Sequence, residues 1–455
     1  MEDYTYMNRF KFIALSILGF IFFLVPFELG GEKRIAISHI VNIVTSNYFD
    51  AFISFTQFSA WVVLLGTLVF SVYTSKYNTL NDLFKASPLN AVMRILGSLL
   101  YLMVIGEWFV DTSWAGLILD PNTGGLMAGD GGLLTTLYIT FFAGLLFLPL
   151  LTHFGSVEFI GTMIGKFVEK VFKVPGYSAI DAIASFVGDG TIGIVVTDTQ
   201  YQRGYYNRRE AYIIATSFSI VGIAFASAVA EELGFSGIFP IFYGSIALVT
   251  VIIALITARL PLAKFGPDYY NGVTPVRIEV PSDRSVLRHA LVTAETQAGS
   301  VNLFETVIGT LRSIAHIYVG FLPIIMLVGT VALVLAEHTS LFNILATPLV
   351  PLYQLIGYSA EVAAMMAPAS IVGFADMYLP SLFISASASE ASRFFIGVLA
   401  FTQLVFMSET GMVLAKSKIG LNFFDVIKVF VYRTALSFPI LLVITNVLVW
   451  GGIIK

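Results

Sequence analysis

The segment SFVGDGTIGIVVTDTQ, residues Ser185–Gln200, decides the fold of this 455-residue chain. It contains two aspartates, three glycines and three threonines, although the whole chain is 57% hydrophobic and only 12% charged. That composition is typical of a protein that crosses a membrane many times. Because charged side chains and helix breakers are costly at membrane depth, the segment predicts a non-spanning structure with a functional role.

Eight apolar stretches are long enough to cross a hydrocarbon core of about 30 Å as helices, and a shorter run at 12–27 precedes them, which gives nine predicted crossings. They are residues 12–27, 52–72, 92–110, 132–151, 211–230, 237–258, 314–336, 393–415 and 434–452. No cleavage site follows the first stretch, which we interpret as a retained helix. The sequence therefore predicts an all-α polytopic membrane protein, embedded in the lipid bilayer of the cell membrane.

The distribution of lysine and arginine orients these crossings. The connections 111–131, 232–236 and 337–350 contain neither lysine nor arginine. The connections 74–94, 152–173 and 259–313 each contain several of these residues. The positive-inside rule then predicts that the N-terminus is cytoplasmic and the C-terminus is outside. Lys33 and Arg34 fall on the predicted outer side and depart from the rule.

Short matches recur in the same order in two halves of the chain. The matches are FLP at 147–149 and 321–323, GYSA at 176–179 and 357–360, EA at 210–211 and 390–391, and the last serine of FAS at 227 and of FMS at 408. Their offsets are 174, 181, 180 and 181 residues. The first half begins with a crossing toward the cytoplasm and the second with a crossing away from it. The sequence thus predicts two inverted-topology repeats with a site near the bilayer midplane.

These features divide the chain into four parts. We expect an N-terminal three-helix addition at 1–131, a first repeat at 132–258, a cytoplasmic loop and amphipathic connector at 259–313, and a second repeat at 314–455. The connector carries several prolines and charges, so we interpret it as a surface loop and not as a regulatory element.

Each repeat contains a polar segment that is too short to span the membrane. Ser178–Val187 is followed by the break Gly188–Gly190, and Glu361–Val372 is followed by the break Gly373–Pro380. Glycine tolerates unusual dihedral angles, and proline has no backbone N–H to donate. The sequence therefore predicts two re-entrant helical hairpins, one entering from the cytoplasm and the other from outside.

Three carboxylates in these apolar surroundings are candidates for a functional site. Asp189 and Asp376 lie at the predicted hairpin tips, and Glu409 lies deep in the crossing 393–415, beside Gly411. An intramembrane carboxylate marks a functional site by default, although Glu409 has the alternative of a hydrogen-bonded role in helix packing.

Other acidic residues have simpler explanations. Asp198 runs into a basic stretch, so we interpret it as a surface cap or as the partner of Arg203 or Arg208 in a salt bridge. Glu231 and Glu232 end the crossing 211–230 and are interpreted as part of an extracellular rim.

Two pairs of segments resemble a known family. GYSAIDAIASFVGDGTIG with REAYIIATSFSIVGIAFAS, and GYSAEVAAMMAPASIVGFADMYLPS with FTQLVFMSETG, resemble the nucleoside-recognition or Gate domain. That domain is shared by concentrative nucleoside transporters and the membrane part of the ferrous-iron transporter FeoB. The likeness is greatest to bacterial YjiH-type Gate proteins, and it covers about residues 132–452.

The resemblance implies hairpins that meet near the midplane, with substrate held between their tips and two unwound crossings. The substrate-binding or ion-coupling candidates are Gly188, Asp189, Gly190, Thr191, Asp376, Gln403, Ser408, Glu409 and Thr410, joined by the crossing hydroxyl of Ser227. The chain departs from the nucleoside transporters in lacking their Gln-Thr-Glu hairpin signature. It also lacks the GTPase domain and the gate cysteine of FeoB.

We therefore expect a secondary active transporter of a small polar solute (an amino acid, a small peptide or a nucleoside). It would work by alternating access, coupled to Na⁺ or H⁺ and without a cofactor. The alternatives are a non-transporting gate-fold membrane protein with a structural or signalling role, and a metal-ion permease.

An enzyme is not expected from the motifs present. Phe186 stands where an intramembrane aspartyl protease needs the first glycine of its motif, and the chain has no H-E-x-x-H. The net charge of −4 gives no basic face for nucleic acid, so no nucleic-acid partner is expected. The sequence leaves homo-oligomerisation open.

Overall fold

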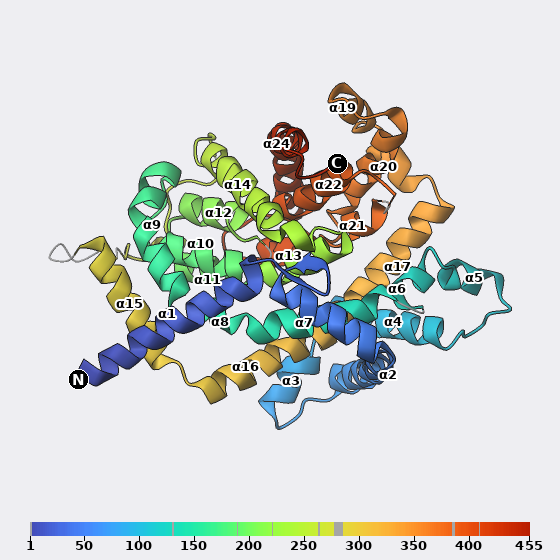
Figure 1. The fold of residues 1–455 in the computed structure, drawn as a ribbon, viewed down its shortest axis with the longest axis horizontal. Coiled ribbons are helices and arrows are strands. Elements are labelled where there is room, and N and C mark those ends of the chain that lie inside the picture. Colours follow the sequence, from blue (N-terminus) through green and yellow to red (C-terminus); the bar gives the residue numbers. More distant parts are fainter. Residues whose placement is uncertain are drawn as a thin grey trace. The chain divides into compact units, whose positions relative to one another are not determined.

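The computed structural model describes residues 2–129, 132–188, 190–220, 222–262, 264–276, 285–384, 387–408 and 410–455. These residues form helices almost throughout, with one short antiparallel hairpin of β1 (Phe27–Leu29) and β2 (Glu32–Arg34). The course of the helices is drawn in Figure 1. The predicted all-α class is confirmed.

Seven segments of the described chain are long and apolar enough to cross a membrane. They comprise α1 (Glu2–Leu24), α2 (Ala36–Val72), α4 (Pro88–Ile105), α6 to α8 (Gly124–Ala128, Leu133–Phe147 and Pro149–Thr152), η1 with α14 (Ser236–Ile238 and Phe239–Thr257), α16 to α17 (Leu303–His316, Ile317–Phe321 and Leu322–His338) and α24 (Phe423–Trp450). They account for seven of the nine predicted crossings. The last begins at Phe423, well before the predicted start at 434.

The other two predicted crossings are broken in the middle. The first broken crossing consists of α12 (Arg208–Ser217) and α13 (Ile223–Glu232), and the second of α22 (Glu390–Thr402) and α23 (Thr410–Lys416). The unwinding that the family resemblance implied is therefore present in both repeats.

Both predicted hairpins are also present, each as two helices around a break. The first hairpin is α10 (Ser178–Val187) and α11 (Gly190–Gln202), and the second is α20 (Ala360–Val372) and α21 (Leu379–Phe383). Pro380 lies in the first turn of α21, where its missing N–H costs no intrahelical hydrogen bond. The side of the membrane from which each hairpin enters stays a prediction.

The chain forms two compact units. Unit 1 comprises residues 1–36, 147–306 and 386–455, and unit 2 comprises residues 37–146 and 307–385. Unit 1 therefore holds the first hairpin and both broken crossings, whereas unit 2 holds the second hairpin. The four-part division of the chain expected from the sequence stays a prediction.

In unit 1, the predicted connector contains a packed helix. Helix α15 (Val286–Ser300) lies against α9 (Ser156–Phe172) and α1. Its alanines 290, 294 and 298 recur every fourth residue and are fully buried, so one face of small side chains permits close helix approach. The expected loop and amphipathic connector therefore contains a packed helix at residues 286–300, with one buried face of small side chains.

In unit 2, two tyrosines that are 180 residues apart bind each other's backbone. The hydroxyl of Tyr318 donates to the carbonyl of Tyr138 at 2.7 Å, and the hydroxyl of Tyr138 donates to the carbonyl of Tyr318 at 3.5 Å. Their ring centroids are 4.3 Å apart. The separation lies within the range of the repeat offsets, 174 to 181, and equivalent residues contact each other reciprocally where a two-fold axis passes. This pair supports the predicted internal repeat.

Candidate functional site

The tip of the first hairpin lies directly against the break of the first broken crossing. A Cβ atom added at Gly222 would lie 1.7 Å from the carbonyl oxygen of Gly188. One added at Gly190 would lie 2.7 Å from the carbonyl oxygen of Ser219 and 2.9 Å from that of Ile220. Only glycine permits this approach of two backbones. The predicted residues Gly188 and Gly190 are therefore held against the backbone of the break between α12 and α13.

The break of the second crossing is a compact turn stabilised by Thr410. Leu404 has a positive φ of 65°, which is uncommon for a residue with a side chain. The hydroxyl of Thr410 accepts from the N–H of Phe406 at 3.1 Å and donates to the carbonyl of Leu404 at 2.8 Å. Gly411 N–H then donates to the carbonyl of Phe406 at 2.7 Å. Thr410 thus shapes the unwound segment through its side chain.

Arg433 joins the two broken crossings. This residue of α24 is completely buried, and its Nε donates to the carbonyl of Thr402 at 2.7 Å. Its Nη1 donates to the carbonyl of Thr216 at 2.8 Å, while Nη2 has no hydrogen-bond partner among the described residues. Thr402 and Thr216 lie in the last turns of α22 and α12, where carbonyl groups lack intrahelical partners. One guanidinium therefore binds the C-terminal ends of both half-helices.

Neighbouring polar residues of α24 fix the same helix end. Gln403 Nε2 donates to the hydroxyl of Thr434 at 3.1 Å, and the hydroxyl of Ser437 donates to that of Thr402 at 3.0 Å. All four side chains are buried. The predicted residue Gln403 thus belongs to a polar cluster around Arg433.

The remaining predicted residues divide by location. Asp189 and Glu409 lie outside the described residues. Ser408 lies in the second break, where its buried Oγ has no hydrogen-bond partner among the described residues, and Thr191 is in the first turn of α11. Ser227 donates to the carbonyl of Ala224 within α13, so its hydroxyl is satisfied by its own helix.

Asp376 belongs to unit 2. It is buried, and its Oδ1 accepts from the N–H of Tyr378 at 2.8 Å, directly before α21. A contact to the backbone N–H two residues further on is that of an Asx turn, and α21 itself has no side-chain cap at Tyr378. Its role in binding stays a prediction.

The acidic residues with simpler explanations form specific contacts. Asp198 Oδ1 accepts from the N–H of Lys418 at 2.7 Å, and Oδ2 accepts from Gln202 Nε2 at 3.0 Å. Among the ion pairs of the described residues, neither Arg203 nor Arg208 pairs with Asp198, so an anchor to the end of α23 takes the place of the suggested salt bridge. Glu231 forms an ion pair with Arg34, which explains a cation on the predicted outer side.

Sequence reasoning missed Arg433. The predicted crossing is 434–452, so Arg433 lies just before it and was not considered as a residue inside the membrane. The available signal was an arginine at the eleventh position of the 28-residue helix Phe423–Trp450, beyond Asp425 and Lys428 in its first turns, where a charge among apolar residues needs a partner.

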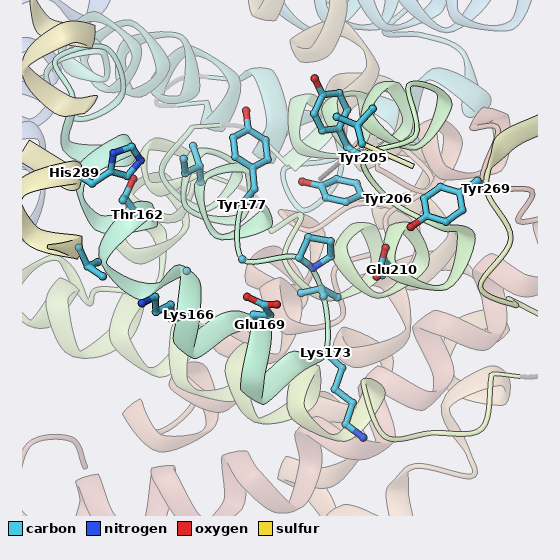
Figure 2. A pocket seen from close by; sticks show the side chains of 18 residues that line it. Thr162, Lys166, Glu169, Lys173, Tyr177, Tyr205, Tyr206, Glu210, Tyr269 and His289 are labelled. Carbon is cyan, nitrogen blue, oxygen red and sulfur yellow. The ribbon is translucent and has the colours of Figure 1, made fainter. Parts of the chain in front are cut away.

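A cavity of about 700 Å³ lies elsewhere in unit 1, between α9, the start of α10 and α15 (Figure 2). Lys166, Glu169, Tyr177 and His289 are among its lining side chains, and the ring of Tyr177 lies 6.4 Å from that of Tyr205. No predicted site residue in the described part of the chain lines this cavity. The cavity and the convergent helix breaks are therefore separate features.

Beside the cavity, the lining residue Tyr206 donates a hydrogen bond to Asp181. Asp181 lies in the first turn of α10 and outside the seven apolar spans. Burial raises the pKa of Asp181 to about 6, and the hydrogen bond from Tyr206 opposes this increase. The carboxyl group therefore titrates near neutral pH.

Comparison with known proteins adds the family. The family model of the Gate domain, described as nucleoside recognition, matches residues 134–236. The uncharacterized protein BpOF4_10220 of Alkalihalophilus pseudofirmus is 36% identical over 453 residues, covering 98% of this chain and 96% of that protein. This chain is a Gate-domain membrane protein of the same family. The resemblance read from the sequence is confirmed.

The Gate match covers the first hairpin and the first broken crossing of this Gate-domain protein. Among solved structures, CNTnw in an inward-facing substrate-bound state aligns with a TM-score of 0.44 and 14% identity, over 90% of this chain and 97% of CNTnw. A CNTnw variant in an outward-facing state aligns with a TM-score of 0.42 and 17% identity, over 97% of this chain and 96% of the variant.

Proposed function

We propose that this Gate-domain protein is a secondary active transporter of a small polar solute that works by alternating access. The observation that supports the proposal is the convergence, in unit 1, of one hairpin tip and two helix breaks. Unwound backbone at membrane depth is tolerated only where it is packed in protein or lines a cavity, and in transporters it binds substrate and ions.

The Gate match favours a nucleoside as the solute, because its description is nucleoside recognition. Amino acids and small peptides are the other solutes of the proposal, since the chain lacks the Gln-Thr-Glu signature of the nucleoside transporters. The coupling ion is Na⁺ or H⁺. Asp189 and Glu409 are the proposed carboxylates of unit 1, with Gln403, Ser408 and backbone groups of Gly188 and Gly190 as further contacts, and Asp376 is the proposed carboxylate of unit 2.

Uptake into proteoliposomes tests this function. Labelled nucleosides, amino acids and dipeptides are supplied under an inward Na⁺ gradient, an inward H⁺ gradient or neither. We expect one solute class to accumulate with one ion gradient. Asp189→Asn and Glu409→Gln are each expected to lower uptake at least about tenfold, since an intramembrane carboxylate is retained for function. Glu305→Gln, a change at an exposed residue of α16, is the matched control and should retain full uptake.

Two outcomes separate the alternatives. Gradient-driven uptake that persists in both carboxylate variants contradicts the proposed site but not transport. Absence of uptake for the whole panel, with a divalent metal transported instead, favours a metal-ion permease. Absence of any flux favours a structural or signalling role.

A further inference from the structure

The buried cation between the two broken crossings is the guanidinium group of Arg433. The described chain contains five ion pairs, and Arg433 belongs to none of them. Its two hydrogen-bonded partners are instead the carbonyls of Thr402 and Thr216, at 2.7 and 2.8 Å. A fully buried guanidinium is therefore balanced by backbone carbonyl groups within the described structure, and not by a carboxylate.

The two helix ends supply the compensating negative charge. The C-terminus of a helix carries about half a negative elementary charge, and α12 and α22 both present this end to Arg433. Two such ends together match about one positive charge. The position is thus built to hold one monovalent cation.

We propose that the guanidinium of Arg433 is a tethered cation that fills the cation position between α12 and α22, so that this chain uses no Na⁺ there. In transporters with broken helices, the C-terminal ends and unwound carbonyls of the half-helices coordinate the coupling cation. Here the guanidinium already occupies those carbonyls, and a second cation would be repelled at short range. The inference deepens the proposed transport function. It rests on that function for the claim that this position would otherwise bind a coupling ion.

Neighbouring contacts keep the guanidinium in this position. Ser437 binds the hydroxyl of Thr402, whose carbonyl accepts from Arg433, and Thr434 binds Gln403 one residue further along. These contacts come from the same part of α24, so the arginine and the end of α22 are held together. The cation cannot leave with the solute, unlike a coupling ion.

Thermal unfolding of the purified full-length protein tests the tethered cation without knowledge of the solute. Tm is measured at constant ionic strength in NaCl, KCl, LiCl and choline chloride, and with low millimolar guanidinium. A rise of Tm in Na⁺ over choline chloride should be absent from the wild-type protein or smaller there than in Arg433→Gln. Arg433→Gln should have a lower Tm in choline chloride, with a saturable rise of about 3 °C in Na⁺ or guanidinium at a large excess over Kd.

Two further variants provide the controls. Arg433→Lys keeps the positive charge and should respond to Na⁺ as the wild-type protein does. Arg393→Gln is matched, because Arg393 also donates to a carbonyl at a helix end, that of Leu233 at 2.6 Å, but lies away from both breaks. It should lower Tm equally in every salt.

Three results would overturn the inference. They are a saturable Na⁺-specific rise of Tm that is as large in the wild-type protein as in Arg433→Gln, an Arg433→Gln protein that responds to all salts alike, and an Arg433→Gln protein that is unfolded in every salt, guanidinium included. Uptake separates this inference from the proposed function. Na⁺-driven uptake whose Na⁺ dependence is the same in Arg433→Gln as in the wild-type protein would refute the tethered cation and leave transport intact. If no uptake is found, the Tm measurement alone decides the role of Arg433.

Discussion

At the scale of single residues, backbone groups make most of the contacts that hold the site. Gly222 meets the carbonyl of Gly188, Thr410 binds the backbone around Leu404, and Arg433 binds two carbonyls. A buried ion costs several kcal/mol unless it is compensated, so the burial of Arg433 requires both helix ends to stay in place. The side chains that shape the site thereby also fix the positions of the half-helices.

Gly222→Ala tests the contact between the hairpin tip and the break. The new methyl group would meet a carbonyl oxygen at 1.7 Å, and a backbone atom cannot move aside as a flexible side chain does. We expect a loss of about 3 kcal/mol in stability, or a displaced hairpin with loss of uptake. Thermal unfolding and uptake measure the two effects. Gly244→Ala, in α14 with open space around it, is the control and should be neutral or slightly stabilising. Equal behaviour of both variants would contradict the contact.

Asp181→Asn tests the buried carboxyl group beside the cavity. Its pKa in the folded protein is about 6, above the ordinary 3.8, so the folded protein binds this proton more tightly than the unfolded chain. The corresponding stability is fully present below about pH 4 and is lost as pH rises through 6, by roughly 3 kcal/mol in total. The asparagine keeps an acceptor for Tyr206 but cannot ionise.

Thermal unfolding between pH 5 and 7.5 measures this effect. The wild-type protein should lose stability as pH rises over this window, and Asp181→Asn should lose much less. Glu305→Gln, at an exposed residue, should follow the wild-type curve. A pH dependence that is unchanged in Asp181→Asn would show that another group is responsible.

At the scale of elements, the helix breaks were predictable and the residue that joins them was not. The breaks at Gly188–Gly190 and Gly373–Pro380 can be predicted from the local sequence, because glycine and proline act locally on the backbone. The breaks at 218–222 and 403–409 have weaker local signals, and only the family resemblance implied them. Arg433 was missed because its partners are backbone carbonyls 31 and 217 residues away, and the sequence near Arg433 does not indicate them.

The Tyr138–Tyr318 pair tests the contact between equivalent elements of the two repeats. Each hydroxyl donates to the other residue's carbonyl, and the rings are in contact. We expect Tyr138→Phe and Tyr318→Phe each to cost about 1 kcal/mol of stability. The double variant should cost less than the sum by at least about 0.5 kcal/mol, because both changes disrupt one network.

Thermal unfolding of the four proteins of this cycle provides the coupling energy. Tyr48→Phe, at a residue that is 61% exposed, is the control and should change stability little. Strictly additive single effects would show that the two tyrosines act independently. This pair was not predicted from the sequence, since one aromatic match carries no weight in a chain with 14% aromatic residues.

At the scale of the whole molecule, the internal repeat explains why similar parts occur twice. Each repeat contributes one hairpin and one broken crossing, in the same order. The four short sequence matches have offsets of 174 to 181, and the reciprocal tyrosine pair has an offset of 180. If the repeats are inverted, as the loop charges predict, the two hairpins enter from opposite sides of the membrane. Topology is therefore the property on which the alternating-access proposal depends.

The cysteine-free sequence permits a direct test of this topology. Ser113→Cys, in the connection predicted to lie outside, should react with a membrane-impermeant maleimide on intact cells. Ser300→Cys, at the exposed end of α15 in the predicted cytoplasmic connector, should react only after the cells are opened. The expected contrast follows from the lysines and arginines of 259–313 and their absence from 111–131. The reverse labelling pattern would invert the orientation but keep the repeats opposed. Labelling of both sites on intact cells would place these two connections on one side and contradict the predicted arrangement of crossings.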